Sequence, residues 1–294
     1  MSGELIWENE GKDWPNRENS RFVKAGGLRW HVQIGGKAIG QGPVMLLLHG
    51  TGASTHSWRD MLPLLAQHFT VIVPDLPGHG FTSPAATNQL SLEGMSRAVQ
   101  ALLVALDLQP AYIVGHSAGV AIALRMCLDG VVAPRGVVGI NAALMPFGGF
   151  ASQLFPVMAK LLVLNPFVPR FVARRAEDKI AVTRLIEGTG SRLDAIGLEL
   201  YRRLFSSREH VAATLGMMAN WQLEGLQRDL RKLTVPLTLI VGEADKAVPP
   251  EDARKIKRVV PQATLVSLPR VGHLCHEERP GEITQIILDR CQSE

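Results

Sequence analysis

Short apolar runs alternate with helix-like segments along most of this chain of 294 residues. The run at residues 44–48 contains no polar residue, which is typical of a strand buried on both faces of a sheet. Strands that alternate with helices predict a mostly parallel sheet with helices on both of its faces. We expect strands at residues 28–33, 44–48, 71–73, 112–114, 137–140, 237–241 and 264–268, and helices at residues 58–66, 95–106, 120–128, 252–259 and 283–291. Pro63 lies inside the first of these helices, so we expect that helix to be short or kinked.

The alternation is interrupted between residues 140 and 236. Residues from about 144 to 225 have helical apolar spacing, and residues 144–215 hold ten Lys and Arg against six Asp and Glu. This excess equals the net charge of +4 of the whole chain, so the basic character is concentrated in one segment. The simplest interpretation is a helical cap, residues 144–225, inserted between the two parts of a core, residues 1–143 and 226–294.

The composition limits the class of protein. The hydrophobic share of 46% and the charged share of 20% are those of an ordinary globular protein. The N-terminal residues are polar and do not resemble a signal peptide, and no apolar run is long enough to cross a bilayer, so we expect a cytoplasmic location. Three widely spaced cysteines fit neither a disulfide framework nor a C-x-x-C metal site. An aromatic share of only 5% argues against nucleic acid as a partner.

The motif Gly115-His116-Ser117-Ala118-Gly119 is the strongest local signal for chemistry. It follows an expected strand and precedes an expected helix, so the chain must reverse sharply at Ser117. Glycines on both sides leave room for such a strained turn. The turn raises the Ser117 hydroxyl at the C-terminal end of the sheet, beside a helix N-terminus that favours negative charge. Ser117 is therefore the candidate nucleophile.

A serine nucleophile needs a base, and the base needs a group that orients it. Asp245 follows the expected strand at residues 237–241, and His273 follows the one at residues 264–268. The C-terminal ends of parallel strands share one edge of the sheet, so we expect both side chains near Ser117. Glu243 as the acid and His276 as the base remain open alternatives.

A glycine-rich turn, His49-Gly50-Thr51-Gly52, ends the strand at residues 44–48. The backbone N–H groups of Thr51 and Ala118 are expected to form an oxyanion hole. His49, Gly50, Gly52 and His116 are expected to line the substrate site, with His49, His79 and His116 as hydrogen-bonding supports. The spacing of the histidines does not suggest a metal site, and no nucleotide-binding motif follows a strand, so we expect neither metal nor cofactor.

With these residues placed, residues 20–290 resemble the α/β-hydrolase superfamily. The matching landmarks, in order, are His49-Gly50, Trp58, residues 74–80 (Pro-Asp-Leu-Pro-Gly-His-Gly), residues 115–119, residues 242–245, Gly272-His273, Glu277 and Pro280. The resemblance implies a twisted, mostly parallel eight-stranded sheet with a helical cap. It also implies that Ser117 is the nucleophile, His273 the general base and Asp245 the acid that orients it. A serine at position 117 does not match the aspartate of haloalkane dehalogenases and epoxide hydrolases.

Three N-terminal segments are similar to a narrower family, the magnesium-chelatase accessory proteins of bacteriochlorophyll biosynthesis. The segments are residues 13–17 (Asp-Trp-Pro-Asn-Arg), residues 27–33 (Gly-Leu-Arg-Trp-His-Val-Gln) and residues 49–59. The resemblance implies a role near magnesium insertion into protoporphyrin, with magnesium chelatase as a candidate partner and a tetrapyrrole as a candidate small-molecule substrate.

The expected cap leaves three interpretations open. Residues 154–158 and 161–164 are apolar, whereas Arg170, Arg174 and Arg175 are cationic. Such a surface would suit a flat apolar macrocycle with carboxylate arms, or peripheral contact with a membrane. An ordinary lid packed on the core, with solvated arginines, fits equally well.

Two functions follow from these observations. The first is a serine hydrolase that cleaves an ester-like carbonyl substrate through an acyl-enzyme. The second is a non-catalytic accessory protein that binds a tetrapyrrole or the chelatase. The sequence leaves the scissile bond open, because several carbonyl chemistries use the same residues.

Overall fold

The computed structural model describes residues 5–145 and 167–292 of the chain. The apolar residues 154–158 and 161–164 of the expected cap therefore lie outside the described residues. None of the described helices combines the length and the apolar character that a membrane span requires.

An eight-stranded sheet forms the centre of the molecule, with the strands in the order β1-β2-β4-β3-β5-β6-β7-β8. Both pairings of β2 are antiparallel and the other five are parallel, which confirms the mostly parallel sheet. The strands are β1 (Ser20–Ala25), β2 (Leu28–Gly36), β3 (Val44–Leu48), β4 (Thr70–Pro74), β5 (Tyr112–His116), β6 (Gly136–Ile140), β7 (Leu237–Gly242) and β8 (Thr264–Leu268).

The first strand is absent from the sequence-based expectation. Its residues are only partly buried and include Arg21 and Lys24, so no apolar run marks it. It is positioned by a tight turn at Gly26 and Gly27, both of which have a positive φ that suits glycine. The turn pairs β1 with β2 at the edge of the sheet.

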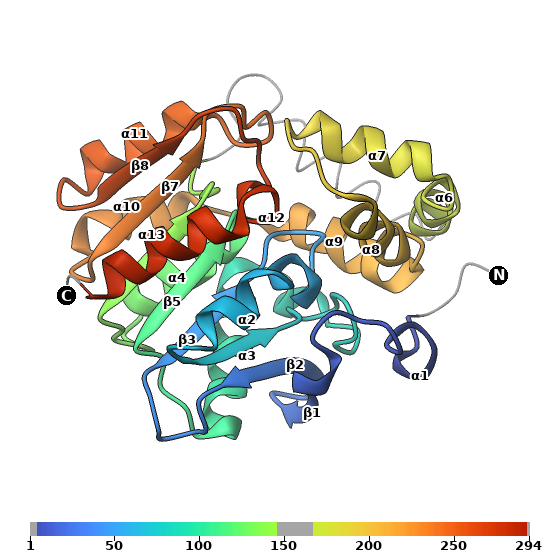
Figure 1. Ribbon diagram of the computed structural model, residues 1–294, viewed down its shortest axis with the longest axis horizontal. Helices are drawn as coiled ribbons and strands as arrows, with labels where there is room; N and C mark the ends of the chain where they lie inside the picture. Colours follow the sequence, from blue (N-terminus) through green and yellow to red (C-terminus); the bar gives the residue numbers. More distant parts are fainter. Residues whose placement is uncertain (1–4, 146–166, 293–294) are drawn as a thin grey trace.

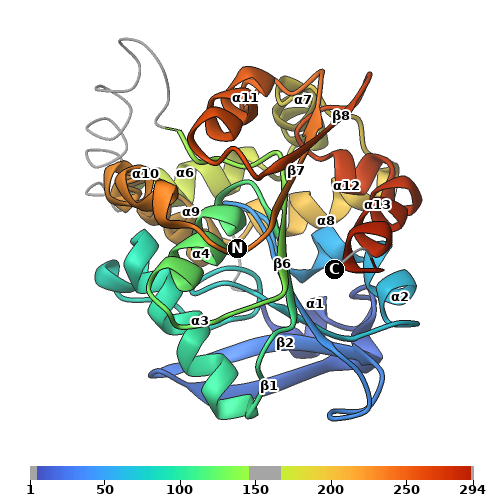
Figure 2. The ribbon, with the colours of Figure 1, turned by 90° about the vertical axis from the view of Figure 1, so that its left-hand side faces the viewer.

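Helices cover both faces of the sheet (Figure 2). One face packs against α3 (Leu92–Leu106), α4 (Ala118–Leu128), α10 (Glu224–Asp229) and α11 (Pro250–Val259). The other packs against α2 (Met61–Leu65), α12 (Cys275–Glu278) and α13 (Pro280–Gln292). As Pro63 indicated, α2 is short, and a separate 3-10 turn, η2 (Thr55–Trp58), precedes it.

Among the described residues, four further helices follow β6 and precede α10. They are α6 (Phe167–Arg175), α7 (Lys179–Gly188), α8 (Ala195–Phe205) and α9 (Arg208–Asn220), and we call them the α6–α9 layer. Figure 1 shows the layer beside the sheet, at the end where β7 meets the loops before α12. The layer falls within residues 144–225, whose separation from the core as a cap stays a prediction.

The N-terminal segment joins the core to this layer. It contains α1 (Trp7–Glu10) and the 3-10 turn η1 (Arg17–Asn19). The buried Trp14 donates its indole N–H to Thr55 Oγ1 over 3.0 Å and packs with Phe81 and with Leu204 of α8. Asp13 accepts two hydrogen bonds from Arg203 of α8, at 2.6 and 2.7 Å. Residues that precede the sheet thus help to fix α8.

Candidate active site

Ser117 occupies the sharp turn between β5 and α4. Its φ of 52° and ψ of −116° are strained for a residue with a side chain. The flanking glycines are required by space, since a Cβ at Gly119 would lie 2.2 Å from the Leu48 carbonyl oxygen and one at Gly115 would lie 2.6 Å from the Val120 nitrogen. The turn leaves Ser117 8% exposed at the C-terminal end of the sheet.

Asp245 and His273 come together on the loops that follow β7 and β8. His273 Nδ1 donates to Asp245 Oδ2 over 2.8 Å. The other carboxylate oxygen, Oδ1, accepts the backbone N–H groups of Ala247 and Val248, both at 2.8 Å. Both oxygens therefore have fixed partners, and the imidazole is held with its Nδ1 toward the acid.

The His273 loop is also held from the side of β5 and β6. The His273 carbonyl oxygen accepts hydrogen bonds from His116 Nε2, at 2.9 Å, and from Asn141 Nδ2, at 2.7 Å. Asn141 Oδ1 accepts the N–H of Gly242 at the end of β7 over 2.8 Å. Sequence reasoning missed Asn141, although its place directly after β6, at the same edge of the sheet, was a usable signal.

Ser117 lies beside this pair without a hydrogen bond to it. The rings of His116, its neighbour in sequence, and His273 have centroids 4.7 Å apart. Within the described residues, Ser117 Oγ has no hydrogen-bond partner. Serine–histidine contacts of unliganded enzymes often shorten only when a substrate binds. The structure thus joins Asp245 to His273 and leaves the third contact open.

The turn after β3 passes directly over Ser117. A Cβ at Gly50 would lie 3.1 Å from the Ser117 Cβ, so glycine permits the close approach. Neither the Thr51 N–H nor the Ala118 N–H donates to an acceptor in the part of the chain that the structure describes. Two donors without acceptors beside the serine are what an oxyanion hole requires.

The His49 side chain stabilises this turn through two hydrogen bonds to the backbone. Its Nε2 accepts the N–H of Leu76 over 2.9 Å, so its Nδ1 carries the proton and donates to the Gly50 carbonyl over 2.8 Å. The ring is fully buried, and burial lowers its pKa. Both ring nitrogens are thus engaged within the turn, as for a hydrogen-bonding support. The substrate contacts of His49, Gly50, Gly52 and His116 stay predictions.

The alternative acid and base occupy different surroundings. His276 Nε2 lies 2.7 Å from Ser57 Oγ, the ring is fully buried, and burial lowers its pKa to about 3. Glu243 is exposed to solvent. Neither contacts His273 or Ser117 through a hydrogen bond among the described residues, and no three described His, Cys, Asp or Glu side chains are grouped to hold a metal ion. The geometry therefore favours Asp245 and His273.

Comparison with known proteins agrees with this arrangement of loops around a sheet. A model of the alpha/beta hydrolase family matches residues 45–286, most of the chain. The chain belongs to the α/β-hydrolase family. This match confirms the predicted fold.

A curated relative bears on the narrower resemblance. The magnesium-chelatase 30 kDa subunit of Rhodobacter capsulatus is 43% identical over 277 residues, which cover 94% of this chain and 96% of that protein. The predicted likeness to chelatase accessory proteins is therefore confirmed.

Solved structures of α/β-hydrolases show the same fold at low identity. The lip1 protein of Acinetobacter baumannii AYE superposes with a TM-score of 0.79 at 20% identity and covers 99% of this chain and 97% of its own. An enol-lactonase of Burkholderia xenovorans LB400 gives a TM-score of 0.74 at 20% identity, over 92% of this chain and 98% of its own.

In this α/β-hydrolase, the turn between α7 and α8 is hydrogen-bonded to the two loops that carry Asp245 and His273. The Thr189 carbonyl accepts the N–H groups of Lys246, at 3.0 Å, and His273, at 3.4 Å. Ser191 Oγ accepts the N–H of Leu274 over 2.7 Å. The α6–α9 layer is thereby hydrogen-bonded to both the acid loop and the histidine loop. Sequence reasoning missed this role, because the Thr189–Ser191 stretch has no feature beyond that of an ordinary helix–helix turn.

Gly190, inside that turn, provides a test of this attachment. We expect Gly190→Ala to lower the free energy of unfolding by about 3 kcal/mol, because strain and steric overlap add. Its φ is 87°, and a Cβ there would lie 2.0 Å from the Ala244 carbonyl oxygen. Urea unfolding measures the change. Gly188→Ala is the matched control, since a Cβ at Gly188 meets nothing within 4 Å. Equal effects of the two substitutions would contradict the assigned role.

Proposed function

We propose that this α/β-hydrolase is a serine hydrolase that cleaves an ester-like carbonyl substrate through an acyl-enzyme on Ser117, in association with a magnesium chelatase. The observation that carries the catalytic part is the 2.8 Å hydrogen bond between His273 and Asp245 beside the strained turn at Ser117. The two N–H donors without acceptors, on Thr51 and Ala118, support the same proposal.

The proposed reaction proceeds in two halves. Ser117 Oγ attacks the carbonyl carbon while its proton passes to His273 Nε2, and the Asp245 carboxylate stabilises the resulting imidazolium. The oxyanion accepts hydrogen bonds from the Thr51 and Ala118 N–H groups, each worth about 3 kcal/mol. As the tetrahedral intermediate collapses, His273 returns the proton to the leaving group. A water molecule, deprotonated by His273, then attacks the acyl carbon and releases the acid and Ser117.

The association with a magnesium chelatase rests on the relative from Rhodobacter capsulatus, named as a subunit of that enzyme. Identity of 43% over nearly the full length of both proteins supports a shared role. A tetrapyrrole or a small-molecule ester connected with its synthesis is then the proposed substrate. We place this activity in the cytoplasm, with magnesium chelatase as the partner.

A second candidate function is a non-catalytic accessory that binds a tetrapyrrole or the chelatase. Two observations favour it, namely the name of the same relative as a subunit and the absence of a hydrogen bond from Ser117 Oγ among the described residues. In that case the strained turn would be inherited from a catalytic ancestor of the same fold.

Labelling with a fluorophosphonate tests the proposed nucleophile. We expect a fluorescent fluorophosphonate to label the native protein in a one-to-one ratio, because its phosphorus reacts with an activated serine. Labelling is measured by intact-mass spectrometry and in-gel fluorescence, with Ser117→Ala and heat-denatured protein as controls. Native protein that stays unlabelled would contradict the catalytic proposal.

A second assay distinguishes the two functions. It measures magnesium insertion into protoporphyrin with Ser117→Ala in place of the native protein. An accessory that only binds should support insertion equally well after this change, whereas a serine hydrolase should not.

A further inference from the structure

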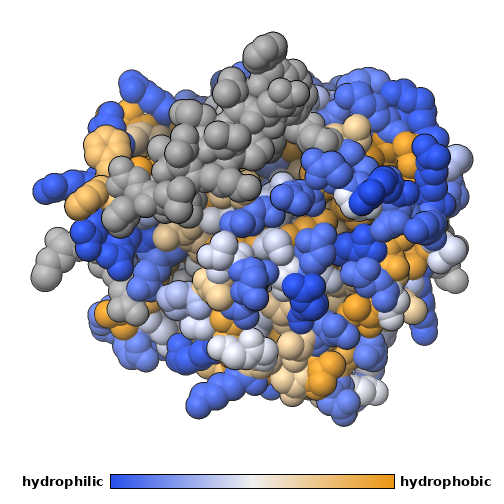
Figure 3. Space-filling model, turned by 180° about the vertical axis from the view of Figure 1, so that it is seen from behind, coloured by the Kyte–Doolittle hydropathy of each residue, from blue (hydrophilic) through white to orange (hydrophobic). Residues whose placement is uncertain are grey.

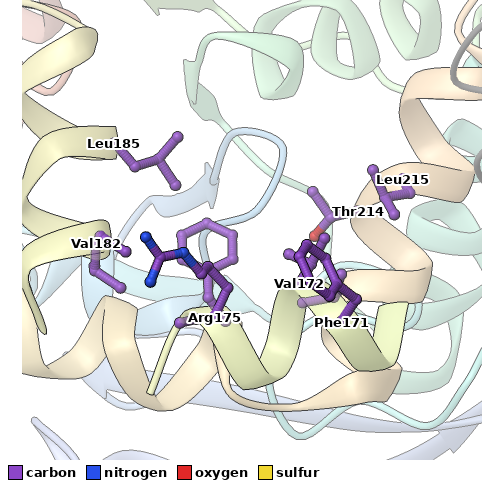
Figure 4. Close-up of a pocket in the computed structure, with 11 residues that line it drawn as sticks. Phe171, Val172, Arg175, Val182, Leu185, Thr214 and Leu215 are labelled. Atoms are coloured by element: carbon purple, nitrogen blue, oxygen red, sulfur yellow. The ribbon is translucent and has the colours of Figure 1, made fainter. Parts of the chain in front are cut away.

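A cavity of about 290 Å³ lies inside the α6–α9 layer (Figure 4). All 11 of its described lining residues lie between Phe171 and Leu215, so they belong to the layer and not to the sheet or its loops. Its walls come from α6, α7, α9 and the end of α8. None of the candidate catalytic residues Ser117, Asp245 and His273 is among these lining residues.

Apolar side chains make up nearly all of the described lining. They include Phe171, Val182, Leu185, Phe205 and Leu215. Phe171 is 70% exposed and Leu185 is 54% exposed, which is unusual for large apolar side chains at the border of a cavity. At the left of Figure 3, apolar side chains protrude among hydrophilic ones on the side of the molecule that α6 forms. A ligand with an apolar body would cover this exposed surface, with a favourable hydrophobic contribution.

Arg175 is the one charged residue among the described lining residues. In Figure 4 its side chain extends from α6 across the cavity toward Val182 of α7. Its side chain is 66% exposed and forms an ion pair with Asp178, with Arg175 Nη1 and Asp178 Oδ2 3.5 Å apart. Within residues 5–145 and 167–292 this is the one ion pair of Arg175, so its other N–H donors are available there to an anionic ligand group, and the planar guanidinium matches a carboxylate.

The charge around the cavity favours an anion as well. Among residues 167–185, cationic side chains outnumber acidic ones, with Arg170, Arg174, Arg175, Lys179 and Arg184 against Glu177 and Asp178. An excess of positive charge raises the local concentration of anionic ligands and speeds their association.

The cavity adjoins the turn over Ser117 at one wall. A Cβ at Gly52 would lie 3.4 Å from the ring of Phe205 and from the methyl group of Thr214, both of which line the cavity. Thr51 Oγ1 donates to Met217 Sδ of α9 over 3.5 Å. A molecule in the cavity would thus contact side chains that pack directly on the proposed oxyanion turn.

From these observations we propose that the α6–α9 cavity binds an amphipathic carboxylate, with its apolar body between Phe171, Val182 and Leu215 and its carboxylate on Arg175. The site is independent of the reaction proposed for Ser117, so binding does not require hydrolysis. Specificity comes from the combination of an apolar enclosure with a single guanidinium.

Isothermal titration calorimetry with dodecanoate, below its micelle concentration, tests the proposal. We expect saturable one-to-one binding by the native protein and equal affinity for Ser117→Ala. Arg175→Gln should weaken dodecanoate binding about tenfold, as expected for loss of a charge-assisted hydrogen bond. The affinity for uncharged dodecan-1-ol should stay the same in this variant. Ala181→Trp, which fills the cavity, should abolish binding of both probes, with thermal unfolding as a check on folding.

Arg184→Gln is the matched control, since Arg184 lies on α7 outside the lining and carries the same charge. It should leave both affinities unchanged. Absence of saturable dodecanoate binding would overturn the proposal, as would equal weakening by Arg184→Gln and Arg175→Gln, which would indicate general charge attraction. Loss of binding in Ser117→Ala would also overturn it, because the ligand would then bind at Ser117 and not in the α6–α9 cavity.

Discussion

Replacing Asp245 with asparagine is expected to lower the rate of p-nitrophenyl acetate hydrolysis about 10⁴-fold, the size of effect known for the equivalent change in serine proteases. The carboxylate Oδ1 accepts the N–H groups of Ala247 and Val248, and an asparagine would keep its carbonyl oxygen there. Its NH₂ group would then face His273 Nδ1. That nitrogen would have to accept instead of donate, which moves the ring proton to Nε2. A protonated neutral Nε2 cannot take the proton of Ser117.

Glu243→Gln is the matched control for Asp245→Asn. The Glu243 side chain is exposed on the same loop, so its neutralisation removes one charge near the site without changing the His273 contact. We expect a change of less than about twofold in this control, as for a screened surface charge. If Asp245→Asn keeps full activity, or if Glu243→Gln loses as much, the assignment of the acid is wrong. Urea unfolding of both variants checks that the fold persists.

Acidification below pH 6.5 is expected to unfold the protein steeply, with a midpoint near pH 5 at about 25 °C. Six fully buried histidines have a lowered pKa, chiefly because burial disfavours their charged form. They are His49, His56, His79, His116, His210 and His276. For His210 the pKa falls to about 4 and for His276 to about 3.

The sign follows from proton uptake on unfolding. An unfolded histidine binds a proton below pH 6.5, whereas these folded ones stay neutral until the pH reaches their lowered pKa values. Each can therefore remove about 1.4 kcal/mol of stability per pH unit in that window. Burial raises the pKa of Glu277 to about 7, so this carboxyl acts in the opposite direction and offsets about one histidine. Asp75, with its pKa lowered to about 2, adds to the loss only below about pH 4.

Urea unfolding curves at several pH values between 7 and 5 measure this dependence. The slope of the unfolding free energy against pH should correspond to an uptake of several protons. Repeating the series in 0.5 M NaCl is the control, because the slope should persist when its cause is burial and not repulsion between surface charges. An uptake below one proton over this range would contradict the buried, neutral state of these rings.

The sequence predicted the sheet well where strands are buried on both faces. Residues such as Val44–Leu48 have neighbours on every side, so their apolar run is uninterrupted and readable. The edge strand β1 was missed because it is half-buried, and its place depends on pairing with β2 instead of on its own composition. The helix expected at residues 58–66 covers only Met61–Leu65, because Trp58 belongs to the preceding 3-10 turn and Pro63 keeps the helix short.

For the candidate site, the sequence placed Ser117, Asp245 and His273 because each follows a strand at one edge of the sheet. It could not place Asn141, Thr189 or Ser191, whose roles are hydrogen bonds between loops that lie far apart in the sequence. The tautomer of His49 was also out of reach, since it depends on two backbone groups that only the folded turn brings together.

The attachment of the N-terminal segment has a consequence for how the α6–α9 layer can move. Trp14 and Asp13 fasten α8 to the core at one end, and the Thr189–Ser191 turn fastens the layer beside His273. Tyr201 of α8 also donates to Glu277, and His210 of α9 donates to the Gly52 carbonyl. Helices α8 and α9 are therefore held to the core at several separate points. Removal of the residues before β1 would delete the contacts of Asp13 and Trp14 and leave α8 held to the core by Tyr201 and by the ion pair of Asp194 with Arg59.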